Sequence, residues 1–239
     1  MMTYKKEDPQ SIQKMFGTIA EQYDRTNAVL SFQMHRIWNR ELVRKVVGSS
    51  YPENMLDLCC GTGEIAFNYL QNRTGSCEAF MLDFCPEMLA CAKNKALQRH
   101  LDRHLIHYLQ ADAQEIPLPS QSIECATMAY GIRNVADPLK SAKEVHRVLK
   151  SGGKFGILEL TQPKNKVLRF GHSVYLKYAL PVLGKFLTSN QEAYNYLCNS
   201  IHTFIPPEKL MSILEDAGFR QVECHPMSSG IATIITAIK

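Results

Sequence analysis

Hydrophobic residues along the chain follow two periods, and the change between them marks how the protein is organised. In the N-terminal part they recur every three or four residues, as on one face of a helix, which predicts helices over residues 9–23 and 34–47. From residue 52 onward, short apolar runs alternate with helical patterns. These predict strands over residues 55–58, 78–82, 105–110, 123–129 and 153–160, and helices over residues 63–70, 86–97 and 138–149. This alternation predicts an α/β protein with a parallel sheet covered by helices on both faces.

Residues 163–204 break the alternation with a mixed aromatic and apolar stretch that contains KVLRFGHSVYLKYALPVLGKFL, which we interpret as an inserted cap. A helix over residues 206–217 follows and ends at Gly218, a residue type that favours helix C-termini. Strands near residues 221–224 and 231–237 then complete the sheet. We therefore expect a single domain over residues 1–239, with a helical segment over residues 1–50 and a cap over about 163–204.

Composition narrows the class of protein. The chain has 239 residues, of which 45% are apolar and 21% charged, as is typical of a globular protein with a sizeable core. The net charge of +4 is only mildly basic, and no run of Lys and Arg is long enough to follow a phosphate backbone. Nucleic acid is therefore not expected as a partner, whereas an anionic membrane surface would suit this charge.

The cysteines and the apolar runs indicate in which compartment of the cell the protein is expected. None of the eight cysteines belongs to a Cys-x-x-Cys pair, and the histidines at 100, 104 and 107 fall on two different elements, so no metal site is expected. The start, MMTYKKEDPQ, has no apolar signal core, and no apolar run reaches about 18 residues. We expect a cytoplasmic protein without a membrane-spanning helix.

A turn with almost no side chains follows the first predicted strand, in the stretch MLDLCCGTGE. Gly61 and Gly63, on either side of Thr62, let a ligand lie against bare backbone, because a Cβ would block that approach. The second predicted strand ends in Asp83, whose carboxylate can accept hydrogen bonds from ribose hydroxyls. These residues predict a nucleoside-containing ligand at the carboxyl ends of the strands.

Two ligand classes fit this turn: a methyl donor and a nicotinamide dinucleotide, whose Gly-x-Gly-x-x-Ala fingerprint is also present. A third reading is that the glycines only form a tight turn. Asp57 favours the methyl donor, since its carboxylate can bind the ammonium of an amino-acid-like ligand but would repel a pyrophosphate. Beyond the third strand, Asp112 can accept from an adenine amino group, and the Ala113 backbone can meet the ring edge.

Three ordered motifs resemble those of the ubiquinone/menaquinone biosynthesis C-methyltransferases. The run YDRTNAVLSFQMHRIW resembles the first signature of that family, YGIRNVAD its Phe-Gly-x-Arg-Asn segment, and RVLKSGGKFGILELT its second signature. The matching positions of the first signature are Tyr23, Asp24, Asn27, Leu30, Ser31, His35 and Trp38. The chain departs from the family pattern at Thr26, Ala129, Ser151, Thr161 and the final run GIATIITAIK.

The resemblance implies a class I S-adenosylmethionine-dependent methyltransferase fold, Rossmann-like, with a seven-stranded and mostly parallel sheet. It implies methylation of a ring carbon of a prenylated quinol, most directly demethylmenaquinol, or a methoxy-benzoquinol in ubiquinone makers. Donor contacts carried over by position are Thr62, Asp83, Asp112 and Ala113. A methyltransferase for another small acceptor, a nicotinamide-dependent oxidoreductase and a donor-binding protein without catalysis are the alternatives.

Methylation of carbon requires an electron-rich ring, so we expect the reduced quinol, which can lose a hydroxyl proton to become a phenolate. Arg133, after a strand end and a glycine, is the expected stabiliser of this anion. Asn134 is expected to position a water, and His35 and Tyr23 are candidates for taking the proton.

Two of these residues also have purely structural interpretations. Arg133 could instead cap a helix or pair with Asp137, and His35 could pack beside Trp38. These readings predict contacts inside the protein rather than with a ligand.

The cap is the expected site for the isoprenoid tail or for a membrane surface, because aromatic and basic residues alternate there. A buried cap helix would show the same pattern. The set comprises Phe170, Tyr175, Tyr178, Leu180, Leu183 and Phe186, with Lys166, Arg169, Lys177 and Lys185. The expected partners are thus a prenylated quinol and, as further possibilities, the inner face of the membrane and a second copy in a homodimer.

Overall fold

A single seven-stranded sheet forms the centre of the protein in the computed structural model, which describes residues 8–48, 52–73, 75–180 and 191–239. The strand order is β3-β2-β1-β4-β5-β7-β6, and only β7 runs in the direction opposite to the other six strands. The strands are β1 (Asn54–Leu58), β2 (Glu78–Asp83), β3 (Leu105–Gln110), β4 (Ile123–Ala129), β5 (Leu149–Leu160), β6 (Arg220–Met227) and β7 (Ala232–Ile238). The predicted α/β class with a mostly parallel sheet is confirmed.

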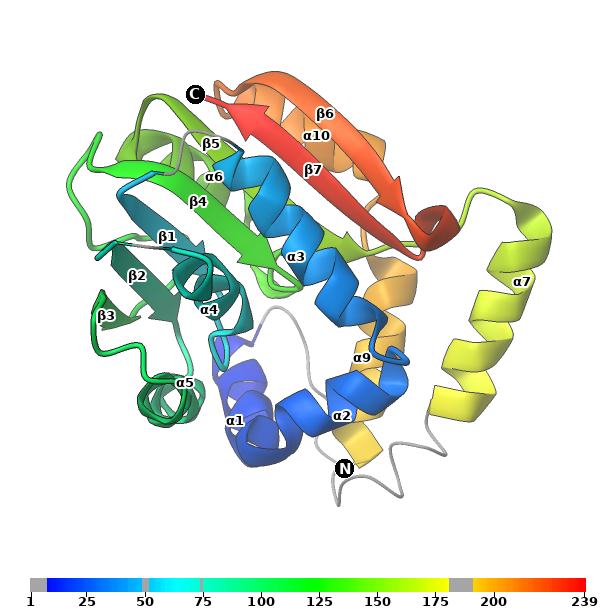
Figure 1. Cartoon of the computed structure of the whole chain (residues 1–239). Coiled ribbons are helices and arrows are strands. Elements are labelled where there is room, and N and C mark those ends of the chain that lie inside the picture. The colour runs from blue at the N-terminus through cyan, green and yellow to red at the C-terminus, as the bar shows by residue number, and fades with distance from the viewer. Residues whose placement is uncertain (1–7, 49–51, 74, 181–190) are drawn as a thin grey trace.

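Helices cover both faces of the sheet (Figure 1). One buried cluster joins the sheet to α3 (Met34–Val47), α4 (Glu64–Gln71) and α5 (Pro86–Gln98). A second cluster joins the opposite face to α6 (Pro138–Val148) and α10 (Pro207–Asp216). The short turns η2 (Ile132–Asn134) and η4 (Ser228–Gly230) follow β4 and β6.

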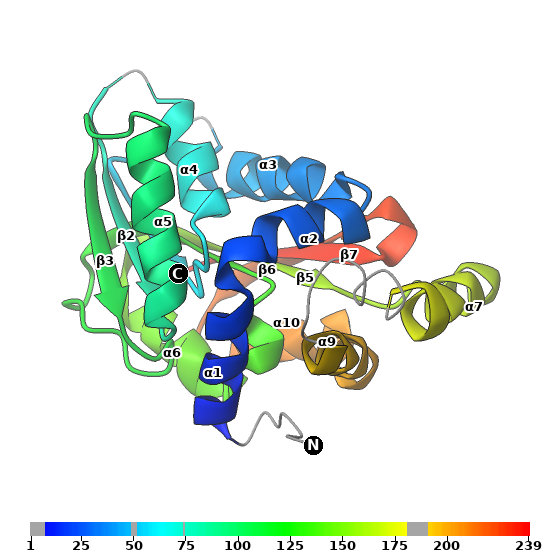
Figure 2. The same ribbon diagram turned by 90° about the horizontal axis from the view of Figure 1, so that it is seen from below.

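The N-terminal segment is more broken than the single helix expected over residues 9–23. It forms α1 (Pro9–Ile19), a 3-10 turn, η1 (Ala20–Gln22), and α2 (Tyr23–Leu30). The chain then reverses at Phe32 and Gln33, both with positive φ, and enters α3. Figures 1 and 2 show α1 and α2 lying across the carboxyl ends of the strands, so this segment covers the edge where a ligand is expected.

The expected cap contains α7 (Lys166–Val174), a π-helical turn η3 (Tyr175–Ala179) and α9 (Gln191–Thr203). Leu176 and Leu180 pack with Leu30, Cys198 and Ile201, so the cap is joined to α2 through its own apolar cluster. Three residues of the expected tail and membrane set, Leu183, Lys185 and Phe186, lie outside the described residues. Within the described part of the chain, no helix is long and apolar enough to cross a membrane.

Candidate functional site

Two adjoining pockets lie at the carboxyl ends of the central strands. The ends of β1, β2 and β4 coincide because Leu58 pairs in register with Leu82 on one side and Met128 on the other. Strand order reverses beside β1, which is where open α/β sheets bind ligands. The larger cavity has a volume of about 990 Å³ and the smaller about 80 Å³. Five residues line both and mark their junction: Tyr23, Cys59, Gly61, Ala129 and Tyr130.

The two glycines of the turn have different roles. Gly61 has φ +53°, and a Cβ placed on it would meet no atom within 4 Å, so its backbone is open to both pockets. Gly63 has φ +90°, and a Cβ there would lie 2.6 Å from the side chains of Met81 and Phe67. Gly63 lines neither pocket, so it serves the packing of α4 on the sheet, whereas Gly61 forms the bare surface.

Asp83 ends β2 and supports this turn. Its carboxylate accepts a hydrogen bond from Gly61 N at 2.8 Å and another from Cys85 N at 2.9 Å. Burial raises the pKa of Asp83 to about 6. A carboxylate offers about four acceptor sites, so acceptor capacity remains for hydroxyl groups of a ligand in the smaller pocket.

Asp57 is buried beneath the turn and lines the larger cavity. Its carboxylate accepts from Thr127 Oγ1 at 2.8 Å and from Ala66 N at 3.2 Å. Burial raises the pKa of Asp57 to about 7 despite these two hydrogen bonds. A cation placed beside it would favour the ionised form and be held in turn.

The raised pKa of Asp57 makes the stability of the protein depend on pH. Between the unfolded value of about 4 and the folded value of about 7, the folded state holds a proton that the unfolded chain lacks. The free energy of unfolding should therefore fall as pH rises through this window, by at most about 1.4 kcal/mol per pH unit from this one group.

The variant Asp57→Asn tests this dependence, because its amide can donate to Thr127 and accept from Ala66 N. Urea titrations from pH 5 to 8 should show that the free energy of unfolding of this variant increases relative to that of the wild type as the pH rises to 7. Parallel curves would contradict the assignment.

Asp112 and Ala113 line the smaller pocket, as expected, together with Ile12 and Phe16 of α1. Asp112 accepts from the Gln114 backbone N–H at 2.8 Å, which fixes its carboxylate at the pocket edge. The contribution of α1 was not foreseen, because nothing local in the sequence indicates that this helix folds back over the ends of β2 and β3.

Thr62 lines the larger cavity, but its hydroxyl donates to Asp24 of α2. Lys95 of α5 contacts the same carboxylate and also Glu64, at 2.7 Å, and Arg99 binds Glu64 at 2.6 Å. This ionic cluster joins α2, α4 and α5 above the glycine turn. Of its members, only Asp24 had been singled out from the sequence, as part of the first signature.

Arg133 lies in η2, faces the larger cavity and is only 8% exposed. Its Nη1 forms an ion pair with the buried carboxylate of Glu159, which also accepts from Leu160 N at 2.8 Å. Arg133 Nε and Glu159 Oε2 are buried without a hydrogen-bond partner in the described structure, so both groups retain unused hydrogen-bonding capacity. The interpretation that Arg133 pairs with Asp137 is wrong, because Asp137 instead caps α6 by accepting from Lys140 N at 3.0 Å. Glu159 was not identified from the sequence.

Asn134 follows Arg133 but faces the smaller pocket. Its side-chain oxygen accepts from the Tyr196 hydroxyl at 2.9 Å, which links η2 to α9. The structure thus places these two neighbours in different pockets.

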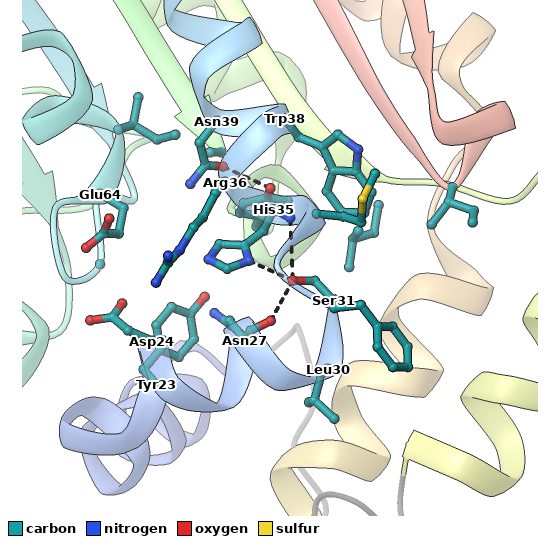
Figure 3. A pocket seen from close by; sticks show the side chains of 18 of the residues that line it. Tyr23, Asp24, Asn27, Leu30, Ser31, His35, Arg36, Trp38, Asn39 and Glu64 are labelled. Carbon is teal, nitrogen blue, oxygen red and sulfur yellow. Dashed lines mark hydrogen bonds between the residues drawn. The ribbon is translucent and has the colours of Figure 1, made fainter. Parts of the chain in front are cut away.

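Tyr23 and His35 both face the larger cavity (Figure 3). Burial raises the pKa of the Tyr23 phenol, and the charge of Arg133 opposes that rise. Burial, and after it the charge of Arg36, lowers the pKa of His35, so its ring is neutral at neutral pH. The Ser31 hydroxyl donates its one proton to the Asn27 carbonyl at 2.7 Å, so its 2.6 Å contact with His35 Nδ1 requires the proton on that nitrogen. The Nε2 atom of neutral His35 is therefore an acceptor.

Comparison with known proteins gives one family and several close relatives. The model of the ubiE/COQ5 methyltransferase family matches residues 2–239. A demethylmenaquinone methyltransferase from Protochlamydia amoebophila is 54% identical over 239 residues, covering 100% of this chain and 99% of that protein. A ubiquinone/menaquinone biosynthesis C-methyltransferase UbiE from Rickettsia bellii is 35% identical, covering 95% of this chain and 92% of its own length.

Solved structures with the same fold are more distant. The crystal structure of a putative S-adenosyl-L-methionine-dependent methyltransferase from Methanococcus maripaludis has a TM-score of 0.63 at 21% identity, covering 100% of this chain and 96% of that one. A second, from Thermotoga maritima, has a TM-score of 0.63 at 17% identity, covering 95% and 99%. These similarities identify the fold as that of the class I methyltransferases.

Proposed function

Because the chain belongs to the ubiE/COQ5 methyltransferase family, we propose that it methylates a ring carbon of a prenylated quinol, using S-adenosylmethionine, and that the quinol is demethylmenaquinol. The observation that carries this proposal is the junction at Gly61, where bare backbone separates a small recess from a large cavity with an apolar far end. The relative with 54% identity favours the naphthoquinol over the benzoquinol.

The residues around the junction fit the methyl donor. Asp83 has acceptor sites left for the ribose hydroxyls, and Asp112 with Ala113 would receive the adenine. Asp57 would attract the amino group of the methionine part. The donor supplies a methyl group already activated on a cationic sulfonium, so the chain need only orient the acceptor and manage its proton.

The larger cavity fits the acceptor. Its volume of about 990 Å³ lies at the upper end of small-molecule sites. The end next to Gly61 carries polar side chains, whereas the far end is lined by Leu30, Leu176, Leu180, Leu197 and Ile201. A polar ring with an isoprenoid tail matches this division.

The side chains at the junction supply the chemistry of the ring. A quinol that loses a hydroxyl proton gains electron density on the adjacent carbon, so a fixed cation should lower the barrier. Arg133, held by Glu159, would stabilise that phenolate. His35, neutral and with an unprotonated Nε2, would accept the proton, and the protonated phenol of Tyr23 would orient the ring.

The test is a methylation assay with purified protein, S-adenosylmethionine and a short-chain demethylmenaquinol under reducing conditions. Mass spectrometry should show the gain of one methyl group from the quinol, and none from the oxidised quinone. Methylation of a methoxy-benzoquinol alone would move the acceptor to the ubiquinone branch. Binding of the donor without methylation of either quinol would overturn the proposal.

Gly61 offers a direct test of the bare-backbone surface. In Gly61→Ala the new methyl group projects into the space assigned to the donor, so the Kd for S-adenosylmethionine should rise by about 10–10²-fold, as expected for about 1–3 kcal/mol of overpacking. Gly152→Ala is the matched control, because Gly152 also has a positive φ (+78°) and open space around its missing Cβ. Isothermal titration calorimetry should show weakened binding only at position 61. Equal loss in both variants would mean that backbone strain, and not contact with the donor, sets the effect.

A further inference from the structure

An exposed apolar surface flanks the open end of the larger cavity. We define this docking surface by Val29 and Phe32 at the turn between α2 and α3, and Val167, Phe170, Val174 and Tyr178 on α7 and η3. We propose that it docks on an anionic phospholipid bilayer, so that the cavity opens directly onto the membrane. This inference rests on the proposed function, since a prenylated acceptor resides in lipid.

The two parts of the docking surface adjoin one another. The Phe32 ring lies 6.0 Å from that of Tyr175, and the Tyr175 hydroxyl donates to the Leu30 carbonyl at 2.6 Å. Figures 1 and 2 both show α7 extending beyond this turn, away from the sheet. The α2–α3 turn and α7 thus form one continuous edge of the molecule.

This edge is also the rim of the cavity. Phe32 and Val167 line the cavity although they are 71% and 78% exposed, and Leu168 does so at 47%. A residue can combine both properties only where the cavity opens to the outside. Apolar side chains at the rim continue the apolar lining of the far end, so a tail could pass between bilayer and cavity without crossing water.

The outer face of α7 has no partner within the described structure. Val167, Phe170 and Val174 follow a helical spacing of three and four, and none of the α7 residues is buried. An apolar ring that is 72% exposed, that of Phe170, on a helix that faces away from the core is typical of a surface that contacts a membrane or another protein.

The positive charge of the two segments that carry the docking surface favours an anionic partner. All 23 acidic residues lie outside residues 25–40 and 161–191, the two segments that carry the docking surface. The basic residues described in these segments are Arg25, Arg36, Arg40, Lys164, Lys166, Arg169 and Lys177, of which Lys164 is already paired with Glu208 of α10 at 2.6 Å. Basic residues that border exposed aromatic and aliphatic side chains bind bilayers by combining burial with attraction to anionic headgroups. A neutral protein partner or a second copy would not require this absence of acids.

Vesicle co-sedimentation tests the inference. The probe is vesicles of phosphatidylcholine and phosphatidylglycerol in equal amounts, compared with vesicles of phosphatidylcholine alone. The full chain should sediment with the anionic vesicles and lose this binding at high salt. Phe170→Ser with Val174→Ser, two residues outside the cavity lining, should weaken it about tenfold or more. Leu97→Ser with Leu105→Ser, at 65% and 56% exposure elsewhere on the surface, is the matched control and should bind as the wild type does.

Measurements of methylation activity separate a failure of the membrane-docking inference from a failure of the proposed function. The Phe170→Ser, Val174→Ser variant should methylate a water-soluble short-chain quinol as the wild type does, and lose activity only on a long-chain quinol in vesicles. Wild-type protein that methylates the short-chain quinol but does not sediment would overturn the docking surface alone. Light scattering that shows a dimer dissociated by the same two substitutions would assign the surface to a second copy and overturn the inference as well. Failure to methylate any quinol would instead count against the proposed function.

Discussion

Replacing Arg133 by methionine and Glu159 by glutamine together should leave a folded protein that binds S-adenosylmethionine but has a kcat about 10²–10³-fold lower. Losing one fixed group that faces a developing anion typically raises the barrier by about 2.7–4 kcal/mol. Arg133 is the buried cation of the larger cavity whose Nε has no partner within the described residues, and its pairing with Glu159 keeps it in place. Steady-state kinetics on the short-chain quinol, with donor binding measured by calorimetry, would test this expectation.

The single substitution Arg133→Met serves as the control for stability. Arg133→Met alone leaves the Glu159 carboxylate buried without its partner, which typically costs about 3–5 kcal/mol, whereas removing both charges is often neutral. The double variant should therefore regain the stability that the single variant loses. If the double variant also regained turnover, the pair would be only structural, and Arg133 would have no part in the chemistry.

Replacing Asp83 by asparagine should weaken S-adenosylmethionine binding by at least about 10²-fold. Two hydrogen bonds from ribose hydroxyls to a carboxylate contribute about 1.5–3 kcal/mol each. The neutral amide also has one acceptor oxygen where the carboxylate accepts from both Gly61 N and Cys85 N, so one backbone donor would face an NH₂ group. The substitution would therefore weaken the contact with the ligand and also distort the glycine turn.

Calorimetry of donor binding would measure this loss, with Asp102→Asn as the control. Asp102 is an exposed carboxylate on the turn before β3, so its substitution removes the same charge far from either pocket. Wild-type affinity in Asp83→Asn would remove this residue from the donor site and reopen the position of the nucleoside.

Much of the fold, and the residues that gather around the glycine turn, could be predicted because the signals are local. Strand and helix periods in residues 52–160 follow from burial on two faces, and Gly61, Asp83 and Asp112 stand at strand ends that any parallel sheet brings to one edge. The motif resemblance led to the correct family, since signatures of this kind are read from residue order alone. The different roles of Gly61, which forms open backbone surface, and Gly63, which allows close packing, were not predictable, because they depend on which neighbour fills the space beside each Cα.

Residue order by itself thus determined the class of sheet, the family and the position of the glycine turn, because each depends on neighbours within one strand and the turn after it. Only the tertiary structure decided which charges meet. Glu159 lies 26 residues from Arg133, and Asp24 lies 71 residues from Lys95, yet each pair is in contact. It also decided that the turn after α2 lies against η3 to form a rim, since such contacts arise from packing between segments whose separation along the chain leaves no periodic trace.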